Sequence, residues 1–226
     1  MNDKICDVAM EQSNADHFNK YLKVRADKAG LYFVDFSLNG QDRDAGADYL
    51  FTAESNFCLV EYKDDEDCIA AEGRKWRRRN LCEILEVEEN AGWKAHHDVC
   101  HYIAWRDKDT DLRFNIYRKE VCNSKIFPGN EKITCQLPDL SLRVAGTLFA
   151  DEFVAGGRCL GLNDFEEYLK WLMKKSSGSE AETLQLAVSN PNQQVFSTKR
   201  FKSLAEANNW IIQEKALVKG PKKPGP

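Results

Sequence analysis

The chain contains no long hydrophobic run: within its 226 residues, no stretch approaches the roughly 18 consecutive apolar residues that cross a bilayer. The opening residues, MNDKICDVAMEQ, also lack the basic and apolar regions of a signal peptide. We find no Walker loop, no dinucleotide fingerprint, no Ser-His-Asp order and no internal repeat. These absences predict a cytoplasmic protein without membrane association, and they leave no motif for nucleotide-driven or serine-based catalysis.

Cysteine is frequent, but no two cysteines form the C-x-x-C pair of redox and zinc sites. Several lie inside apolar runs, where cysteine behaves as a small hydrophobic residue. We therefore expect buried, reduced thiols, as in cytosolic proteins. The eight cysteines stand at positions 6, 58, 68, 82, 100, 122, 135 and 159.

Apolar residues make up 42% of the chain, which is enough to fill a core, and 30% of the residues are charged. The length fits one large domain, or one domain with a smaller appendage. We expect a core over residues 1–139 and a small α+β region over 140–218. Residues 219–226 are rich in Lys, Pro and Gly, so they predict a disordered tail.

Residues 48–63 are the most informative stretch, because two short apolar runs flank a small polar break. This pattern predicts a β-hairpin. Side chains alternate along a strand, so Glu61 and Lys63 share one face. A two-residue turn at Ser55-Asn56 would place Asp48 opposite Lys63 on that face. We expect a turn displaced by one residue to move Asp48 to the other face.

Asp48, Glu61 and Lys63 together resemble the signature of the PD-(D/E)XK nuclease superfamily, whose fold is called restriction-endonuclease-like. The resemblance covers roughly residues 10–120. It implies that Asp48 and Glu61 hold one or two magnesium or manganese ions, helped by a backbone carbonyl near Tyr62. It also implies that Lys63 orients the attacking water.

Short acid-x-Lys strings also occur by chance, so an ordinary surface hairpin with an incidental Glu-x-Lys is the alternative interpretation. Ala47 stands where the family often has a proline. The functional interpretation is favoured because an apolar strand ends directly in Glu61-Tyr62-Lys63, with an aspartate at the mirrored end of its partner.

The predicted elements follow an order that suits a mixed α/β core. They are a helix over 13–25, a strand over 31–38, the hairpin, a helix ending near residue 85, and strands over 102–105 and 112–117. The resemblance supplies the arrangement: a central mixed sheet flanked by helices. It further implies that an acid on the first helix contributes to the metal site, with Glu11 and Asp16 as candidates.

The net charge of −4 is unusual for a nucleic-acid binder, but the charges are unevenly distributed. Acidic residues concentrate at 64–67 and 86–89, and basic residues at 74–79. The basic run begins a predicted helix whose apolar stripe is Trp76, Leu81, Ile84 and Leu85. We expect phosphate contacts from Arg74, Lys75, Arg77 and Arg78. A solvated basic face paired with the acidic segments remains an equal alternative.

Three of the four histidines lie in one segment, His96-His97-Asp98-Val99-Cys100-His101. In a helix, His97 and His101 could bind one zinc ion. Structural zinc usually needs a second pair of ligands, and the sequence offers no convincing one. We therefore expect hydrogen-bonded histidines here rather than a metal site.

Residues 140–218 show a pattern of their own. We expect a helix beginning near Asn163, strands over 184–188 and 194–197, and a capping box Ser203-x-x-Glu206 that opens a final helix. Substrate recognition, partner binding and support of the core are all compatible with this region.

The expected protein is therefore a metal-dependent nuclease, with DNA as the expected substrate. Family analogy implies a role in defence against foreign DNA or in repair, and control by a partner protein or a homodimer. The alternative is a module on the same fold that does not cut. It would bind nucleic acid, or serve as an immunity or adaptor protein.

Overall fold

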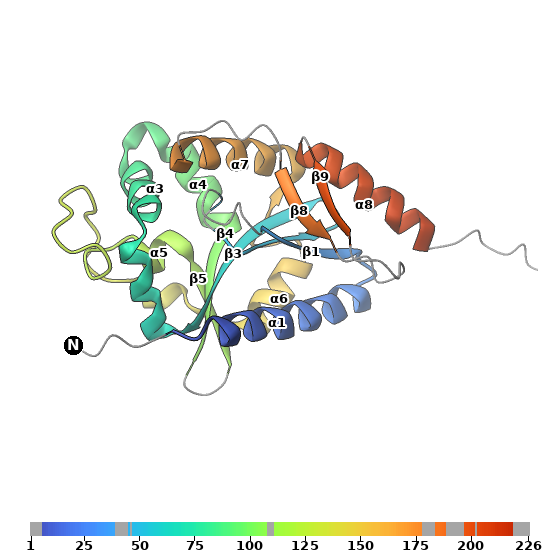
Figure 1. Cartoon of the computed structure of the whole chain (residues 1–226), viewed down its shortest axis with the longest axis horizontal. Helices are drawn as coiled ribbons and strands as arrows, with labels where there is room; N and C mark the ends of the chain where they lie inside the picture. Colours follow the sequence, from blue (N-terminus) through green and yellow to red (C-terminus); the bar gives the residue numbers. More distant parts are fainter. Residues whose placement is uncertain are drawn as a thin grey trace, which may run out of the picture.

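A mixed β-sheet runs through the centre of the computed structural model, and helices cover both of its faces (Figure 1). The structure describes residues 6–38, 45, 47–107, 111–177, 184–188, 197–201 and 203–218. The predicted mixed α/β fold with a helix-flanked sheet is confirmed. The predicted tail at 219–226 lies outside the described residues.

The sheet has the strand order β6-β5-β4-β3-β2-β1-β8-β9, and β7 pairs with β3 beside this path. Its strands are β1 (Phe33–Ser37), β2 (Tyr49–Ala53), β3 (Asn56–Asp65), β4 (His101–Arg106), β5 (Leu112–Ile116), β6 (Val144–Ala145), β7 (Leu160–Gly161), β8 (Leu184–Val188) and β9 (Ser197–Phe201). Among the described strands, β3 and β4 are the parallel pair, and the other pairs are antiparallel.

The connection between the parallel strands β3 and β4 is helical, which is the usual form of a crossover between parallel strands. It comprises the 3-10 helix η1 (Glu66–Arg74), α3 (Trp76–Glu86), η2 (Glu88–Asn90) and α4 (Ala91–Cys100). The other helices are α1 (Val8–Lys28), α5 (Tyr117–Val121), η3 (Leu140–Leu142), α6 (Gly146–Val154), α7 (Leu162–Ser177) and α8 (Leu204–Val218). None of the described helices has an apolar stretch long enough to span a bilayer.

Asp7 caps the N-terminus of α1, since its carboxylate accepts hydrogen bonds from the backbone N–H groups of Ala9 and Met10. Its buried residues follow helical spacing, so one stripe faces the sheet: Ala15, Phe18, Leu22 and Ala26. α1 and α6 lie on one face of the sheet, and α4 and α7 lie on the other (Figure 1).

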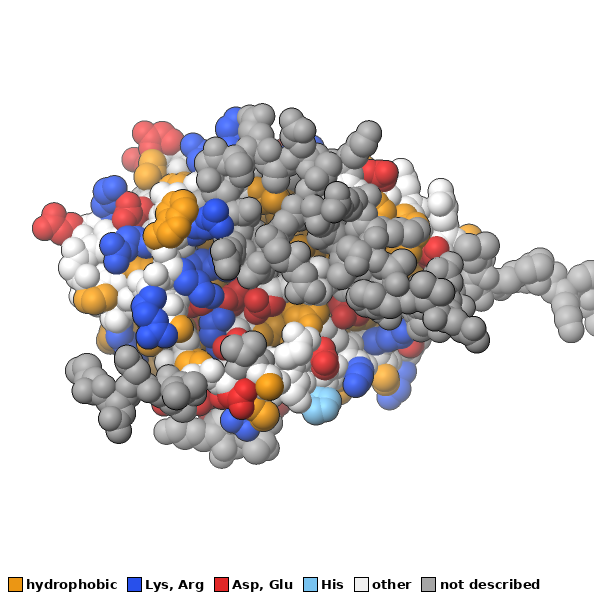
Figure 2. Space-filling model, viewed as in Figure 1, with side chains coloured by type: hydrophobic (Ala, Val, Ile, Leu, Met, Phe, Trp, Pro, Cys, Tyr) orange, Lys and Arg blue, Asp and Glu red, His pale blue; other side chains and the backbone are white. Residues whose placement is uncertain are grey.

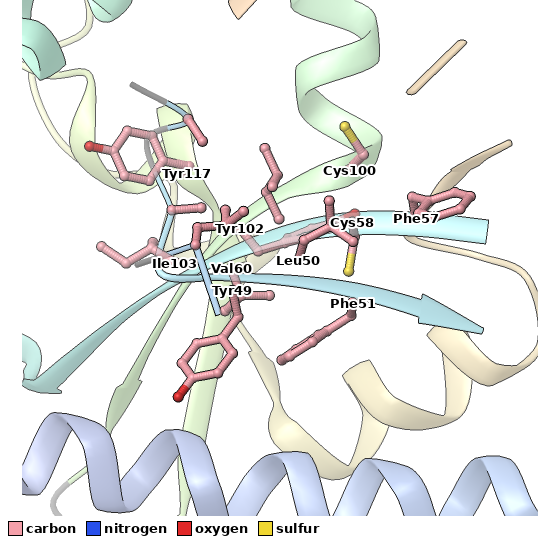
Figure 3. Close-up of a cluster of buried hydrophobic side chains, with 14 of the residues drawn as sticks. Tyr49, Leu50, Phe51, Phe57, Cys58, Val60, Cys100, Tyr102, Ile103 and Tyr117 are labelled. Atoms are coloured by element: carbon pink, nitrogen blue, oxygen red, sulfur yellow. The ribbon is translucent and has the colours of Figure 1, made fainter. Parts of the chain in front are cut away.

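The central strands β2 and β3 are buried on both faces, and their side chains alternate between the two helical layers. Tyr49 and Phe51 point toward α1, and Phe57 lies on the opposite side (Figure 3). There the Phe57 ring stacks on Phe165 of α7, with ring centroids 5.5 Å apart. The β2–β3 hairpin therefore lies at the centre of the core.

The sheet and the core continue across the predicted boundary at residue 139. β8 pairs with β1, and α7 packs against α3 and α4. Ser203 caps α8 as predicted, since its Oγ accepts a hydrogen bond from the Glu206 N–H. The strand predicted at 184–188 is confirmed. Of the strand predicted over 194–197, residues 194–196 lie outside the described residues, and the described strand β9 covers Ser197–Phe201.

Four of the eight cysteines form disulfides, Cys6–Cys68 and Cys82–Cys122, so the prediction of reduced thiols is wrong for these four. The paired residues are 62 and 40 positions apart, and only the fold brings them together. The other four are free thiols. Because disulfides persist mainly in oxidising compartments, the expected cytoplasmic location loses this support and stays a prediction.

Candidate functional site

The β2–β3 hairpin brings Asp48 beside Glu61, two residues along β3 from the expected position opposite Lys63. Ala53 pairs with Asn56, so the two-residue turn is Glu54-Ser55 rather than Ser55-Asn56. Glu54 adopts a left-handed backbone conformation there, with φ of 58°.

The expectation that a displaced turn would move Asp48 to the other face is wrong. Moving a two-residue turn by one residue shifts the pairing by two, and side chains repeat every two residues. The last paired residues before the site are Tyr49 and Val60, so the register continues to Asp48 and Glu61. The Asp48 N–H donates to the Val60 carbonyl at 3.0 Å, and the Asp48 carboxylate accepts from the Tyr62 N–H at 2.7 Å.

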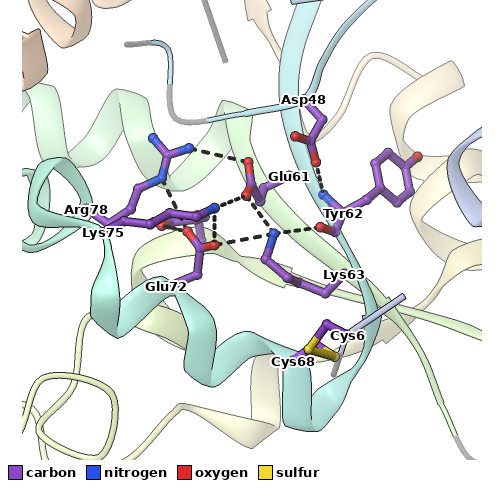
Figure 4. Close-up of polar contacts among 10 residues, drawn as sticks. Cys6, Asp48, Glu61, Tyr62, Lys63, Cys68, Glu72, Lys75 and Arg78 are labelled. Atoms are coloured by element: carbon purple, nitrogen blue, oxygen red, sulfur yellow. Dashed lines mark hydrogen bonds and ion pairs between the residues drawn. A yellow bond between two sulfur atoms is a disulfide. The ribbon is translucent and has the colours of Figure 1, made fainter. Parts of the chain in front are cut away.

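Beyond Asp48, five charged side chains form one network, which we call the charged cluster: Glu61, Lys63, Glu72, Lys75 and Arg78 (Figure 4). Lys63 Nζ donates to Glu61 Oε1 at 2.6 Å and to the Tyr62 carbonyl at 2.7 Å. Lys75 Nζ bridges the two acids, 3.0 Å from Glu61 Oε1 and 2.6 Å from Glu72 Oε1. Arg78 also contacts both acids, at 3.4 and 3.2 Å.

Burial makes the charged cluster depend on its own pairing. Glu61, Lys63, Glu72 and Arg78 each expose 4% of their surface or less, whereas 44% of the Lys75 side chain is exposed. Burial alone would raise the pKa of Glu61, but Lys63 leads the cations that hold it below the usual value. Burial would likewise lower the pKa of Lys63, but Glu61 and Glu72 raise it, so the ammonium stays charged.

Asp48 is in a different electrostatic state from the cluster. Burial, followed by the negative charge of Glu61, raises the pKa of Asp48 to about 7. Nearby Lys63 and Lys75 oppose this shift without cancelling it. Asp48 thus lies at the edge of the charged cluster, and the nearby cations do not fully offset the cost of its negative charge.

α1 brings a third acid to this end of the hairpin. Burial raises the pKa of Glu11, and the charges that act on it include Lys63 and Glu61, so it lies within electrostatic reach of both. Asp16, the other candidate on this helix, is exposed and accepts a hydrogen bond from Gln12. The helix therefore offers Glu11, rather than Asp16, to the site.

Glu72 is a member of the cluster that the sequence did not reveal. It lies on η1, which Asp65 caps by accepting from the Cys68 N–H at 3.2 Å. The Tyr117 hydroxyl donates to Glu72 at 2.7 Å from a distant part of the chain. The next residue must be glycine, because a Cβ on Gly73 would lie 2.3 Å from the Ile126 carbonyl oxygen. No local motif marks such a contact.

The basic run divides between the cluster and the surface. Arg78 is buried and paired with Glu72 and Glu61, so it does not form the surface phosphate contact we expected. Arg74 is exposed, and Lys75 reaches Glu61 from the surface. The Arg77 guanidinium lies over the Trp76 ring, 5.3 Å from its centroid. Part of the predicted phosphate-binding run is therefore structural.

The buried histidine pair shows no metal geometry. His97 lies in the last turn of α4, whereas His101 is the first residue of β4. Their rings are stacked, with centroids 4.6 Å apart, so their nitrogen atoms do not converge on one point. The His101 Nδ1 is 2.9 Å from the Tyr168 hydroxyl. Burial lowers the pKa of His97 well below its usual value, so its ring is neutral.

Magnesium or manganese prefers hard oxygen ligands, and the hairpin offers the Asp48 and Glu61 carboxylates and the Tyr62 carbonyl. The raised pKa values of Asp48 and Glu11 indicate a position where added positive charge would be stabilised. Glu61 already pairs with Lys63, Lys75 and Arg78, and of these three cations Lys75 is the most exposed, at 44% of its side chain. The residues therefore fit a divalent cation. A second acidic group, Asp64, Asp65 and Cys68, is less suitable because Cys68 is in a disulfide.

No protein-family model, curated protein or solved structure matches this chain.

Proposed function

We propose that the protein is a metal-dependent nuclease of the PD-(D/E)XK, restriction-endonuclease-like type. The observation that carries the proposal is the meeting of Asp48, Glu61 and Lys63 at one end of the β2–β3 hairpin. The surrounding topology supports it: a first helix bearing Glu11, three antiparallel strands, and a helical crossover to β4, parallel to β3. DNA is the proposed substrate, and defence against foreign DNA or repair is the proposed setting.

Each residue would have a distinct part in cleavage. Asp48 and Glu61 would hold the cation, which when bound activates water and neutralises phosphodiester charge. Lys63 is held by Glu61 and the Tyr62 carbonyl, so it can orient water or stabilise developing negative charge. Because its pKa is raised, Lys63 stays protonated and does not act as a base. Glu72 would hold the side chains of Lys63 and Arg78 in position through its ion pairs with them.

The test is cleavage of plasmid, linear duplex, single-stranded DNA and RNA, with magnesium, with manganese and with chelator. Asp48→Asn and Lys63→Met keep side-chain size, and Lys94→Ala serves as a control for loss of a lysine outside the cluster. We expect metal-dependent cleavage that both site variants reduce by at least about 100-fold, the scale of losing an electrostatic catalytic group. Cleavage that persists with chelator or in both variants would contradict the proposal.

One observation favours a second candidate, a nucleic-acid-binding or protein-interaction module that does not cut. The Glu61 carboxylate already pairs with Lys63, Lys75 and Arg78. If this pairing is permanent, the cluster is a structural ion network. A folded protein that binds neither manganese nor magnesium, with no cleavage of any substrate, would favour this candidate.

A further inference from the structure

A tryptophan, Trp76, is exposed at the start of α3 and directly follows Lys75 of the charged cluster in the sequence. The sequence pattern assigned Trp76 to the apolar stripe of this helix, but 63% of its surface is exposed. Arg78 turns inward to pair with Glu72, and Leu81, Cys82 and Leu85 form the buried side of the helix. Of the five tryptophans, all within the described residues, Trp76 is the exposed one.

Positive charge surrounds this indole. Arg74, Lys75 and Arg79 are exposed on either side of it, and the Arg77 guanidinium lies over its ring. In Figure 2, Lys and Arg side chains gather over the part of the surface where Figure 1 places α3, with hydrophobic side chains among them. Lys75, the residue before Trp76, reaches Glu61 with its ammonium group. The indole therefore directly follows, along the chain, a residue whose side chain contacts Glu61.

We propose that Trp76 is a stacking platform for an unpaired nucleobase, so that the site takes single-stranded or frayed nucleic acid rather than intact duplex. The choice of ligand rests on the proposed nuclease function. An aromatic ring among cations is how proteins hold single strands, since the ring stacks on a base while the cations follow the phosphates. In a duplex the base faces are covered by their neighbours, and an indole cannot reach them without unstacking.

Two other occupants fit the same surface less well. A membrane-bound helix needs a continuous apolar face to insert, but the apolar side of α3 is buried in the core. The carboxylates of an acidic protein would meet the cations, but a carboxylate has no flat aromatic face to cover the indole. The combination of one ring with several cations matches a base and its flanking phosphates.

The test measures binding of the full chain to labelled oligonucleotides in chelator, so that cleavage plays no part. The ligands are a single DNA strand, a single RNA strand and a blunt DNA duplex. The variants are Trp76→Ala, Trp76→Phe and, as a matched control on the same surface, Arg74→Ala. Trp76 and Arg74 are exposed, so all three variants keep the core intact.

We expect Trp76→Ala to weaken single-strand binding by about 5- to 100-fold, with little effect on the duplex and no change in salt dependence. Trp76→Phe should retain part of the affinity. Arg74→Ala should weaken binding to all ligands and reduce the salt slope by about one. Intrinsic tryptophan fluorescence should be quenched by the single strand, and this quenching should vanish in Trp76→Phe.

Unchanged single-strand affinity in Trp76→Ala, or an equal loss for the duplex, would overturn the inference, as would binding of anionic vesicles alone. Equal affinity for single-stranded DNA and single-stranded RNA would support a platform that contacts only the face of the base. Trp76-dependent binding without cleavage in magnesium would support the platform and count against the nuclease. Metal-dependent cleavage without any Trp76 dependence would reject the platform and leave the nuclease standing.

Discussion

The two ends of strand β3 are equally buried but have opposite chemistry. At one end, Phe57 is fully buried and stacks on Phe165, with no charge nearby in the strand. At the other, Glu61 and Lys63 are just as buried, and they need Glu72, Lys75 and Arg78 to neutralise them.

The difference separates an end whose burial adds stability from an end whose burial is costly. Burial of an apolar side chain stabilises the folded state. In a buried ion pair, by contrast, the attraction between the charges rarely exceeds the cost of removing them from water. Gathering two acids and three cations around the end of a central strand therefore stabilises the fold less than apolar side chains would. Asp48 adds to the cost, since its pKa of about 7 reflects a charge that the fold does not compensate.

The largest expected effect is at the apolar end. Phe57→Ala removes a fully buried ring and leaves a cavity against Phe165, so the free energy of unfolding should fall by about 3–5 kcal/mol. Denaturant unfolding followed by circular dichroism measures this change. A loss under about 1 kcal/mol would mean that burial at this end adds little stability.

Breaking the charged cluster should be nearly as costly. Glu72→Gln leaves Lys63 and Arg78 buried with Glu61 as their remaining acid, so we expect a loss of about 3 kcal/mol. Glu83→Gln is the control, because Glu83 on α3 pairs with the exposed Lys132 and should contribute under about 1 kcal/mol. Equal losses in the two variants would contradict a tightly coupled cluster.

Asp48→Asn should stabilise the protein at high pH. The carboxyl has a pKa of about 7 when folded and near 4 when unfolded, so between these values the folded state alone holds the proton. Stability therefore falls as pH rises through this window, and the full penalty is present above about pH 7. We expect Asp48→Asn to gain about 1–3 kcal/mol at about pH 8 and almost nothing at about pH 4. Thermal melts across this range would show a pH-independent difference if the account is wrong.

Lys75→Ala should have the smallest effect on stability but a clear effect on metal binding. Its ammonium bridges Glu61 and Glu72, where it competes with a divalent cation for the same carboxylates. We expect manganese affinity to rise about tenfold, which is about 1.4 kcal/mol. Arg74→Ala removes a neighbouring charge without a contact to Glu61 and should raise the affinity far less. A fall in affinity in Lys75→Ala would mean that the lysine assists the cation.

The secondary structure was largely predictable because it depends on local patterns. The strand at 184–188 and the start of α8 at Ser203 were predicted from β-propensity and a capping box. The register of the hairpin was not, since Ser55-Asn56 and Glu54-Ser55 are both acceptable turns. In the observed turn, the Glu54 carboxylate accepts a hydrogen bond from the Tyr32 N–H, a long-range contact that no local pattern contains.

The site was predictable only where its residues are close in sequence or recur in a known signature. Asp48, Glu61 and Lys63 meet as the signature implies, and Glu11 lies within their electrostatic reach. Glu72 depends on tertiary contacts with Tyr117 and with the Ile126 carbonyl that no local pattern contains. The inward turn of Arg78, and with it the exposure of Trp76, follows from ion pairing rather than from hydrophobic periodicity.

The most direct test of the central claim is a calorimetric titration of manganese into the wild-type protein, Asp48→Asn and Asp35→Asn at about pH 8. Asp35 is the matched control, because it is another largely buried acid with a raised pKa, but it lies on β1 and bonds Asn19. We predict that the wild type and Asp35→Asn bind manganese, that Asp48→Asn does not, and that wild-type affinity falls as pH drops below about 7. Equal binding by all three proteins, or by none of them, would contradict a metal site at the polar end of β3.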